Sequence, residues 1–480
     1  MDYDIIVVGG GLGGLTAGAK LTREGKKVLL IEQHTQPGGC ATTFRRGDYT
    51  LEVGLHEMDG PSPRDMKNRI FSELGITDNV QLVKVPEFFR FLCRGVDITV
   101  PHDPEEAATV LKENFPAETA GIDSYFEQIL NPKRKGPGGE PLPEMSVGEW
   151  LDSIISDEDL KLVLLGNLGY FHDDPYSLSM TYYNIAQGSY YGGGGASFIK
   201  GGSQMLSDHL AGFIRNHGGE VLLSHVVTGL TTDNGAVTGV TYVKKRGSRE
   251  EQVTATAAEI VMNNAPAHFA EWLPEEYRAK LKGELDKQKT GASLLTVYFG
   301  FSGDLASVGN SHYSTFVFDD SVERQSDILK NNHAGYEKRS FTFVDYGRID
   351  SGLAPAGKSV GALCCIDYLS DWEGMAKGDY NRRKEEVAEI FITRMEKILP
   401  GFRKLVDYCD VGTAATVKRY TLTPGGAVYG FAQVPSKPAI DASALPANVH
   451  IASAWGKTGG GFSGAIFGGY LCAYNILRKR

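Results

Sequence analysis

Apolar and polar positions change period twice within the first forty residues. Residues 4–8 form an almost uninterrupted apolar run, which is typical of a strand buried on both faces. Residues 13–24 follow the period of an amphipathic helix, and residues 27–32 (KVLLIE) predict a second strand. The start of the chain therefore predicts a β-α-β unit, the building block of nucleotide-binding α/β domains.

Strand and helix patterns continue along the rest of the chain without an internal repeat. Residues 203–217 predict an amphipathic helix that ends at Gly218 and Gly219, and a strand follows directly. Ser146 is the expected N-cap of another helix. The remaining strands are expected at residues 236–243, 252–262, 293–301, 359–368 and 448–454, and the remaining helices at 103–130, 384–398 and the C-terminal segment.

Two segments depart from these regular patterns. Residues 131–145 are rich in proline, glycine and charge and predict a loop. Residues 188–202 (GSYYGGGGASFIKGG) are rich in glycine and tyrosine. Because a helical pattern follows them directly, we interpret the second segment as a loop and a strand that cross between domains rather than as disorder.

Composition narrows the class of protein. The chain has 480 residues, 41% of them hydrophobic, and a net charge of −10, which disfavours nucleic acid as a partner. Its six cysteines show no metal-binding spacing, so we expect reduced thiols and no metal site. The N-terminus enters a strand pattern without a signal sequence, and we therefore expect a cytoplasmic protein.

Residues 458–477 carry no charge and are long enough to cross a bilayer. However, this segment opens with Gly459, Gly460 and Gly461 and contains Asn475. A glycine loop at a cofactor, followed by a buried helix, explains those residues better than a transmembrane helix.

The turn between the first strand and helix carries a dinucleotide-binding motif. Gly9, Gly11 and Gly14 form G-x-G-x-x-G, and Gly18 follows on the same helix. The glycines allow a tight turn, close approach to a pyrophosphate and close helix packing, and the helix N-terminus attracts the anion. Glu32 ends the second strand, where an acid accepts ribose hydroxyl groups. Taken alone, the motif fits both NAD and FAD.

Five segments resemble the phytoene desaturase, carotenoid isomerase and retinol saturase family of FAD enzymes. They are DIIVVGGGLGGLTAGAKL, the PGG at residues 37–39, GGSQMLSDHL, GGEVLLSHVV and NVHIASAWGKTGGGFSGAIFGG. The resemblance implies an α/β fold with a Rossmann-like FAD-binding domain of the amine oxidase type and a discontinuous α+β substrate domain. We assign residues 1–75, 200–285 and 405–480 to the FAD-binding domain and residues 76–199 and 286–404 to the substrate-binding domain.

The resemblance also implies which residues contact FAD. Residues matching Gly38 and Gly39 lie beside the pyrophosphate, and Val226 or Val227 meets the adenine through its backbone. The C-terminal glycine block lies against the ribityl chain and the flavin ring. The full set of predicted cofactor contacts is Gly9, Gly11, Leu12, Gly13, Gly14, Glu32, Gln33, Gly38, Gly39, Cys40, Val226, Val227, Asn264, Gly460, Gly461, Ser463 and Gly464.

The middle of the chain is aromatic and poor in ligand-like polar clusters, which is compatible with a long apolar pocket or with ordinary core packing. The family resemblance favours a pocket for a hydrophobic polyene, isoprenoid or lipid. Cys40 and the Gly-x-His at His56 look more like retinol saturase than phytoene desaturase. Cys40 is otherwise a packing residue, and His56 a plain polar partner.

Saturation of a double bond needs a hydride from flavin and a proton from an acid. The candidate proton donors are His56, Glu57 and Tyr429. Desaturation runs the same chemistry in reverse, and isomerisation uses reduced flavin without net electron transfer. The residues do not separate these directions. A second dinucleotide motif is absent from the sequence, so the electron partner stays open.

Two rival functions share this fold. A flavin amine oxidase would need an aromatic cage, to which Trp455 is a candidate contributor, although Trp455 equally suits a core position. A protein of the GDP-dissociation-inhibitor type would hold prenyl groups without flavin, which the glycine motif and Glu32 disfavour. The expected water-insoluble substrate predicts peripheral membrane contact through an exposed apolar patch. The basic residues 478–480 either add to this contact or form a solvated end, and the solvated end is the favoured interpretation.

Overall fold

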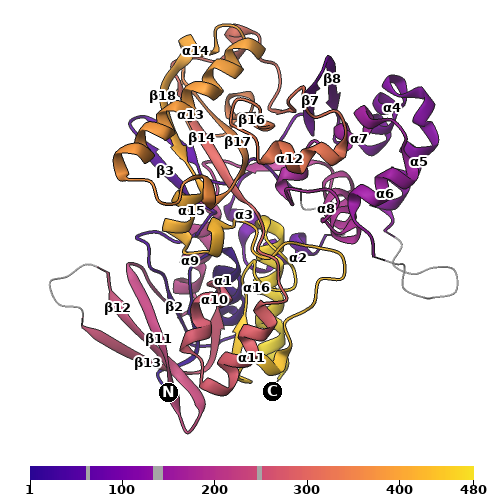
Figure 1. The fold of residues 1–480 in the computed structure, drawn as a ribbon. Helices are drawn as coiled ribbons and strands as arrows, with labels where there is room; N and C mark the ends of the chain where they lie inside the picture. Colours follow the sequence, from indigo (N-terminus) through magenta and orange to yellow (C-terminus); the bar gives the residue numbers. More distant parts are fainter. Residues whose placement is uncertain (61–64, 133–143, 246–250, 480) are drawn as a thin grey trace, which may run out of the picture.

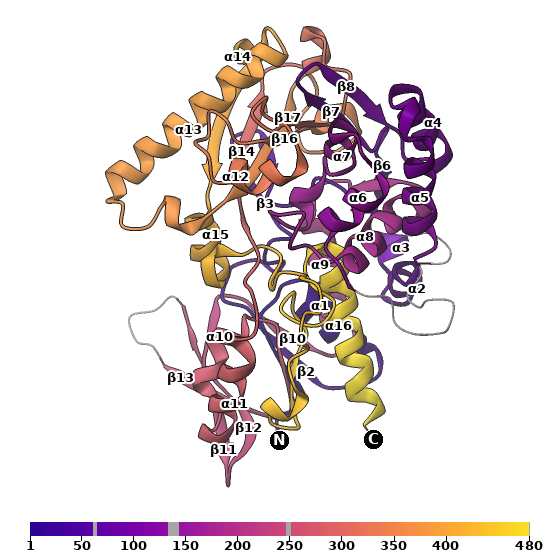
Figure 2. The ribbon, with the colours of Figure 1, turned by 45° about the vertical axis from the view of Figure 1, so that its right-hand side comes forward.

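The computed structural model describes residues 1–60, 65–132, 144–245 and 251–479. Two bodies, each built on a seven-stranded sheet, lie one above the other in Figure 1. Both chain termini lie at the bottom of the lower body, and the chain passes between the bodies several times (Figures 1 and 2). This mixed α/β architecture confirms the predicted fold class.

The lower sheet contains the predicted β-α-β unit. Its order is β10-β2-β1-β13-β12-β11, and β19 also pairs with β13. The strands β10, β2, β1, β13 and β19 run parallel, whereas β11, β12 and β13 form an antiparallel extension. The strands are β1 (Tyr3–Val8), β2 (Val28–Ile31), β10 (Glu220–Leu222), β11 (His225–Asp233), β12 (Ala236–Lys244), β13 (Gln252–Met262) and β19 (Val449–Ile451).

Three helices pack side by side on this sheet. Helix α1 (Leu12–Arg23) lies against α9 (Gln204–Asn216) and against the terminal helix α16 (Gly461–Arg478). Small residues permit this closeness, because a Cβ atom on Gly469 would lie 2.1 Å from the carbonyl oxygen of Gly13. The first and last helices of the chain are therefore in direct contact (Figure 2).

The upper sheet has the order β18-β14-β17-β16-β15-β7-β8 and is antiparallel except between β15 and β7. The long helix α13 (Lys377–Ile398) covers one face through Val387, Phe391 and Met395. The strands are β7 (Phe89–Cys93), β8 (Val96–Val100), β14 (Ser293–Phe301), β15 (Ser314–Val317), β16 (Phe341–Asp345), β17 (Ser359–Asp367) and β18 (Val406–Gly412).

One predicted domain boundary needs correction. Strand β18 falls within residues 405–480, which we assigned to the FAD-binding domain, yet it pairs with β14 of the upper sheet. Backbone hydrogen bonds to a distant strand decide its place, and no local pattern reports them. This boundary therefore lies after Gly412, and the other boundaries remain predictions.

A helical region flanks the upper sheet (Figure 1). The expected N-cap is confirmed, since the Ser146 hydroxyl accepts a hydrogen bond from the amide of Glu149 at the start of α6. The stretch 188–202 is only partly as predicted, because α8 continues through Gly192 before a strand forms. The elements are α4 (Pro104–Asn114), α5 (Thr119–Leu130), α6 (Val147–Ile154), α7 (Glu158–Leu164), α8 (Met180–Gly192) and β9 (Ala196–Ile199).

A small three-stranded sheet, β5-β9-β6, lies between the bodies. It comprises β5 (Met58–Asp59), β6 (Leu82–Lys84) and β9. Most of the predicted loop at 131–145 lies outside the described residues. Other elements include β3 (Thr43–Arg46), β4 (Tyr49–Glu52), α2 (Met66–Glu73), α3 (Ile76–Asn79), α10 (Pro266–Phe269), α11 (Glu275–Leu285), α12 (Ile328–Asn332), α14 (Phe402–Leu405) and α15 (Ala414–Thr421).

Among the described residues, none of the helices, α16 included, has the length and apolarity to cross a membrane. The described ranges also hold no group of three or more histidine, cysteine or acidic side chains arranged for a metal ion.

Candidate functional site

The glycine turn leaves the N-terminus of α1 open. Gly9 has a φ angle of +99°, a conformation that glycine adopts without strain. Gly11 is the N-cap residue, and no side chain caps the helix. The amide of Asn263 holds the turn from the sheet side, since its Nδ2 donates to the carbonyl oxygen of Gly9 at 3.2 Å. The first N–H groups of α1 therefore remain available to an anion.

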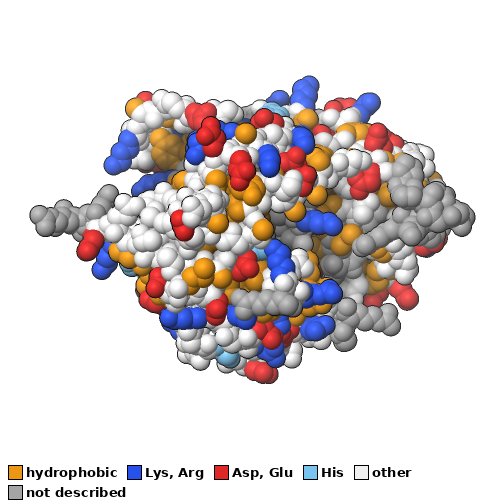
Figure 3. All heavy atoms as spheres, turned by 90° about the horizontal axis from the view of Figure 1, so that it is seen from below, with side chains coloured by type: hydrophobic (Ala, Val, Ile, Leu, Met, Phe, Trp, Pro, Cys, Tyr) orange, Lys and Arg blue, Asp and Glu red, His pale blue; other side chains and the backbone are white. Residues whose placement is uncertain are grey.

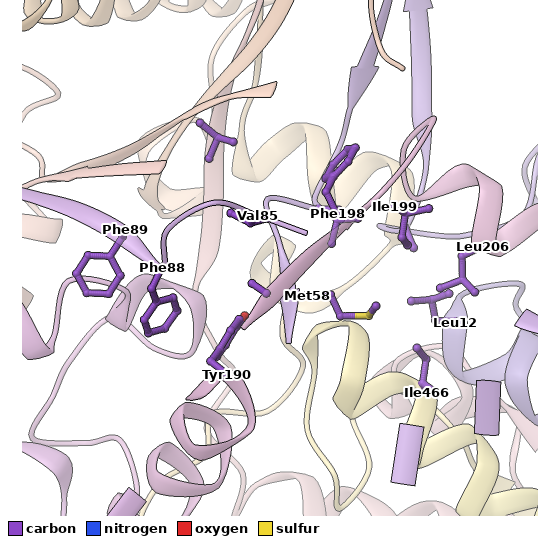
Figure 4. Close-up of a cluster of buried hydrophobic side chains, with 14 of the residues drawn as sticks. Leu12, Met58, Val85, Phe88, Phe89, Tyr190, Phe198, Ile199, Leu206 and Ile466 are labelled. Atoms are coloured by element: carbon purple, nitrogen blue, oxygen red, sulfur yellow. The ribbon is translucent and has the colours of Figure 1, made fainter. Parts of the chain in front are cut away.

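The next residues of α1 serve close packing. A Cβ atom on Gly13 would lie 1.8 Å from the carbonyl oxygen of Ala452, just after β19. On Gly14 it would lie 2.2 Å from the carbonyl oxygen of Gly9. The Leu12 side chain points into the core, where Figure 4 shows it near Met58 and Ile466. Leu12 can therefore offer a cofactor its backbone amide but not its side chain.

Glu32 lies against the glycine turn, as the motif requires. Its carboxylate accepts hydrogen bonds from the amides of Gly10 at 2.6 Å and His34 at 2.9 Å. Each carboxylate oxygen keeps a further lone pair for a ribose hydroxyl. The Gln33 side chain turns away and donates to the carbonyl oxygen of Tyr420 at 3.2 Å.

The start of β11 adjoins Glu32, because the amide of His225 donates to the Glu32 carbonyl oxygen at 2.9 Å. Val226 and Val227 follow directly and pair with Val243 and Tyr242 of β12. The two valines thus lie at the same end of the sheet as the acid that would hold the ribose. Their contact with an adenine stays a prediction.

The second glycine loop lies beside the first. The Gly38 amide donates to the carbonyl oxygen of Gly10 at 2.7 Å, and a Cβ atom on Gly39 would lie 3.4 Å from the Cα of Gly11. Cys40 follows, and its carbonyl oxygen would lie 3.1 Å from a Cβ atom on Gly54. Burial raises the pKa of the Cys40 thiol to about 11, so the neutral thiol predominates at pH 7. This favours packing over redox chemistry for Cys40.

The C-terminal glycine block closes the site from the opposite side. Gly460 is the N-cap residue of α16, which also has no side-chain cap, and Gly461 has a φ angle of +73°. A Cβ atom on Gly460 would lie 2.5 Å from the Cα of Tyr429. A Cβ atom on Gly464 would lie 2.8 Å from the carbonyl oxygen of Gly459. Tyr429 and the start of α16 are therefore held together by backbone contact.

The segment 56–59 links this block to the substrate side. Asp59 accepts a hydrogen bond from the Ser463 hydroxyl at 2.5 Å and forms an ion pair with Lys67. Met58 points toward the start of α1 and α16 (Figure 4). At the other end of the segment, Nδ1 of His56 lies 3.4 Å from the hydroxyl oxygen of Tyr170. Ser463 thus has a protein partner that the sequence did not indicate.

Burial sets the protonation of the predicted proton donors. It lowers the pKa of His56 to about 4, so the imidazole is neutral at pH 7 and a poor acid. Burial and the nearby charge of Glu87 raise the pKa of Glu57 well above its usual range. Burial also raises the pKa of Tyr429. Glu57 is therefore the acid whose proton is most readily transferred.

Glu57 has an unusual environment. It is buried, and neither carboxyl oxygen has a hydrogen-bond partner among the described residues. An ionised carboxylate in such a place is very costly, whereas a neutral carboxylic acid is tolerated. In the described part of the chain, Glu57 therefore makes no hydrogen bond of the kind that a purely structural role would give it.

A largely apolar cavity adjoins this segment between the upper sheet and the turn before α8. It is a small, partly open cavity of about 50 Å³. Tyr170, which contacts His56, belongs to the cavity wall. Cys364 belongs to it as well, and the charge of an ionised Cys364 would raise the pKa of Tyr429. Its other lining residues include Leu168, Phe316, Phe318, Ile328, Phe341 and Ile366.

The arrangement fits a flavin dinucleotide on several independent counts. Two uncapped helix N-termini, the Glu32 carboxylate and two abutting glycine loops belong to one assembly. The Oδ1 atom of Asn264 is buried without a partner among the described residues, as expected for an atom that meets a ligand. A bound flavin would supply hydride transfer here.

Sequence reasoning missed several residues of this assembly. Asn263 follows a buried strand at its carboxyl end, which is a readable signal for a ligand-side position. Asp59, Tyr170 and Cys364 carried no such signal, because only the tertiary contacts bring them to the site. Trp455 is a core residue, since its ring packs edge-on against Phe431 with ring centroids 4.8 Å apart.

Comparison with known proteins places the chain. A prolycopene isomerase from Daucus carota is 25% identical over 89% of this chain and 72% of its own length. An all-trans-retinol 13,14-reductase from Danio rerio is 24% identical over 100% of this chain and 86% of its own length. An oxidoreductase structure from Methanosarcina mazei has a TM-score of 0.68 and 17% identity, and covers 99% of this chain and 100% of its own.

These relatives confirm the resemblance to carotenoid isomerases and retinol saturases. The family model described as flavin containing amine oxidoreductase matches residues 12–477, almost the whole chain. The chain therefore belongs to the flavin containing amine oxidoreductase family.

Proposed function

We propose that this protein is an FAD-dependent oxidoreductase that acts on carbon–carbon double bonds of a long, apolar polyene or isoprenoid-like substrate. The observation that carries the proposal is the contact between the apolar cavity and segment 56–59, through Tyr170. Glu57 belongs to that segment and lies close enough to Tyr170, a residue of the cavity wall, for its charge to raise the pKa of Tyr170. The relatives described above, a prolycopene isomerase and an all-trans-retinol 13,14-reductase, support a polyene.

The chain's own residues have three tasks in this proposal. Glycine loops and helix N-termini bind the cofactor, and Glu32 orients its ribose. Phe316, Phe318 and the other apolar side chains of the cavity exclude water and hold the substrate. Glu57 stores a proton, and Tyr170 of the cavity wall contacts His56, the residue before Glu57.

Saturation is the direction that a neutral Glu57 favours, because that direction consumes a proton. Isomerisation and desaturation remain alternatives within the same substrate class. Trp455 lies in the core against Phe431, so it does not supply the aromatic cage that the amine oxidase rival needs. The cofactor cradle disfavours a flavin-free prenyl carrier.

The proposal is tested with protein reconstituted with FAD. The flavin is reduced without oxygen and mixed with all-trans-retinol, prolycopene or an aromatic amine, while flavin reoxidation and products are followed. Polyene-dependent reoxidation with a saturated product supports the proposal, and isomer formation without reoxidation supports isomerisation. Turnover of oxidised enzyme with the amine alone would contradict the proposal.

A pair of variants links activity to the cavity. Cys364→Phe introduces a large ring into the cavity wall, whereas Cys409→Phe changes a cysteine of β18 outside the residues that line it. We expect Cys364→Phe to lower polyene turnover at least tenfold while the control keeps it. Equal activities would argue against this cavity as the substrate site.

Peripheral membrane contact is part of the same proposal, because such substrates reside in lipid. The face seen from below mixes hydrophobic side chains with charged ones of both signs (Figure 3). That face therefore offers no field of one sign toward anionic lipid, and attachment would depend on apolar contact. Flotation with liposomes tests it, and no binding at low or physiological salt would contradict it.

A further inference from the structure

A proton donor such as Glu57 needs a source of protons, and the cavity beside its segment is lined largely by apolar side chains. Three tyrosines, Tyr170, Tyr190 and Tyr313, lie close enough to Glu57 for its charge to raise their pKa values. Burial also raises each of these pKa values, so the phenols hold their protons tightly. The remaining titratable neighbour that acts on Glu57 is Glu87.

Glu87 is positioned between Glu57 and the surface. Its Oε1 accepts a hydrogen bond from the amide of Tyr313 at 2.6 Å, and its side chain is 13% exposed. Nδ1 of His312 lies 3.9 Å from the same oxygen, and the His312 side chain is 24% exposed. A chain of titratable groups therefore leads from solvent at His312 inward to Glu87.

Tyr313 connects this outer pair to the buried acid. Its backbone amide holds Glu87, while its hydroxyl donates to the carbonyl oxygen of His56, the residue before Glu57. One tyrosine thus spans the distance between Glu87 and the segment that carries Glu57. Tyr313 therefore holds both Glu87 and the segment that carries Glu57 in position.

In the described ranges, buried polar atoms without hydrogen-bond partners lie on Glu57 and on residues next to Tyr313 or in contact with the chain neighbour of Glu87. Both oxygens of Glu57, the hydroxyl of Ser314 and both ring nitrogens of His102 have none among the described residues. Ser314 follows Tyr313 in the chain, and the His102 ring packs 5.5 Å from that of Phe88, next to Glu87. Buried polar atoms without partners commonly bind internal water, which makes up to four hydrogen bonds of its own.

We propose that His312, Glu87 and Glu57 form a proton path from solvent to the substrate cavity, with internal water between the two glutamates. This inference deepens the proposed function and rests on it for its catalytic meaning. A bound reduced flavin would supply the hydride for one carbon of the double bond. Glu57 would donate the proton to the other carbon and be left ionised, and the path would return one proton to it from solvent.

Burial and neighbouring charges shift the pKa values of the titratable groups along the path. Burial raises the pKa of Glu87, although its backbone hydrogen bonds and the charge of Arg348 act in the opposite direction. Burial and the charge of Arg90 lower the pKa of His312, while Asp97 raises it. Burial lowers the pKa of His102 to about 4, and Lys84 acts in the same direction, so His102 contributes as a neutral hydrogen-bonding group.

Infrared spectroscopy of the FAD-reconstituted protein tests the path without any substrate. A protonated carboxylic acid has a carbonyl stretch that shifts when its proton is exchanged for deuterium. Glu57→Gln, which matches the neutral acid in shape, identifies the Glu57 band by its loss, and Glu57→Asp shifts it. The exchange rate of that band after transfer to D₂O measures proton access to Glu57.

We expect Glu87→Gln to slow this exchange at least tenfold and Glu87→Asp to restore most of it. Glu259→Gln is the matched control, because Glu259 also pairs with a histidine, His450, but in the lower sheet. The control should exchange at the wild-type rate. Wild-type exchange in Glu87→Gln, or no band lost in Glu57→Gln, would overturn the proton path.

A second measurement separates this inference from the proposed function. In single-turnover reoxidation by a polyene, Glu87→Gln should lower the rate and increase the solvent isotope effect, while FAD affinity stays unchanged. If wild-type protein turns over no polyene, the proposed function fails. The exchange experiment still decides whether the path exists.

Discussion

The contact between Gly13 and Ala452 yields the sharpest quantitative prediction. Gly13→Ala adds a Cβ atom that would lie 1.8 Å from a backbone carbonyl oxygen, a separation that real Cβ atoms do not show. The obstacle is backbone rather than a flexible side chain. Helix α1 and the chain after β19 must therefore separate by more than an ångström, at the point where the helix N-terminus would meet the pyrophosphate.

The magnitude follows from two opposing effects. Alanine is better than glycine in a helix by about 0.5–1 kcal/mol. Overpacking of a well-packed interior costs about 1–3 kcal/mol, and a rigid backbone contact belongs at the upper end. We therefore expect Gly13→Ala to lower the free energy of unfolding by about 2 kcal/mol and to weaken FAD binding.

Gly283→Ala is the matched control, since Gly283 lies in helix α11 with open space at its Cβ position. This variant should gain about 0.5–1 kcal/mol from helix propensity alone. Urea unfolding measures both stabilities, and flavin fluorescence titration measures FAD binding. If Gly13→Ala unfolds at the wild-type urea concentration and binds FAD equally well, the packing argument is wrong.

Three further changes have expected outcomes. Glu32→Gln should weaken FAD binding roughly tenfold, because a charged acceptor for ribose hydroxyls is lost, and an unchanged Kd would contradict this role. Burial raises the pKa of Asp173, but His172 and Tyr368 outweigh it and lower that pKa to about 2. Asp173→Asn should therefore cost about 2 kcal/mol of stability at pH 7 and almost nothing near pH 2, since the contribution is lost as the pH falls below about 4; a pH-independent cost in urea unfolding would refute this. Phe316→Ala should lower the free energy of unfolding by about 3–5 kcal/mol in the same assay, because it removes a buried ring at the cavity. It should also change the preferred chain length of the substrate. A smaller loss of stability would mean that neighbouring side chains fill the space left by the ring.

Much of the cofactor side was predictable because its determinants are local. The strand of residues 4–8, the glycine turn and Glu32 are read from neighbouring residues, and the structure places them together as expected. The terminal glycine block was recognisable for the same reason. Its glycines lie where two backbone segments are too close together to leave room for a side chain.

The substrate side depends on contacts that no local pattern reports. Residues 188–192 are rich in glycine and therefore predict a loop, yet helix α8 extends through them. Packing against another segment explains this, because a Cβ atom on Gly188 would lie 2.2 Å from the carbonyl oxygen of Ile129. Strand β18 likewise belongs to the sheet of its pairing partner β14.

By itself, the sequence determined the β-α-β unit, the phosphate-binding turn and the acid beside it, since each arises from residues close together in the chain. Only the tertiary structure decided which acid is neutral and which residues face the cavity. Protonation depends on burial and on the charge of distant groups, as the influence of Glu87 on Glu57 shows. Those groups are brought together by the packing of the two bodies, which no single segment of the chain specifies.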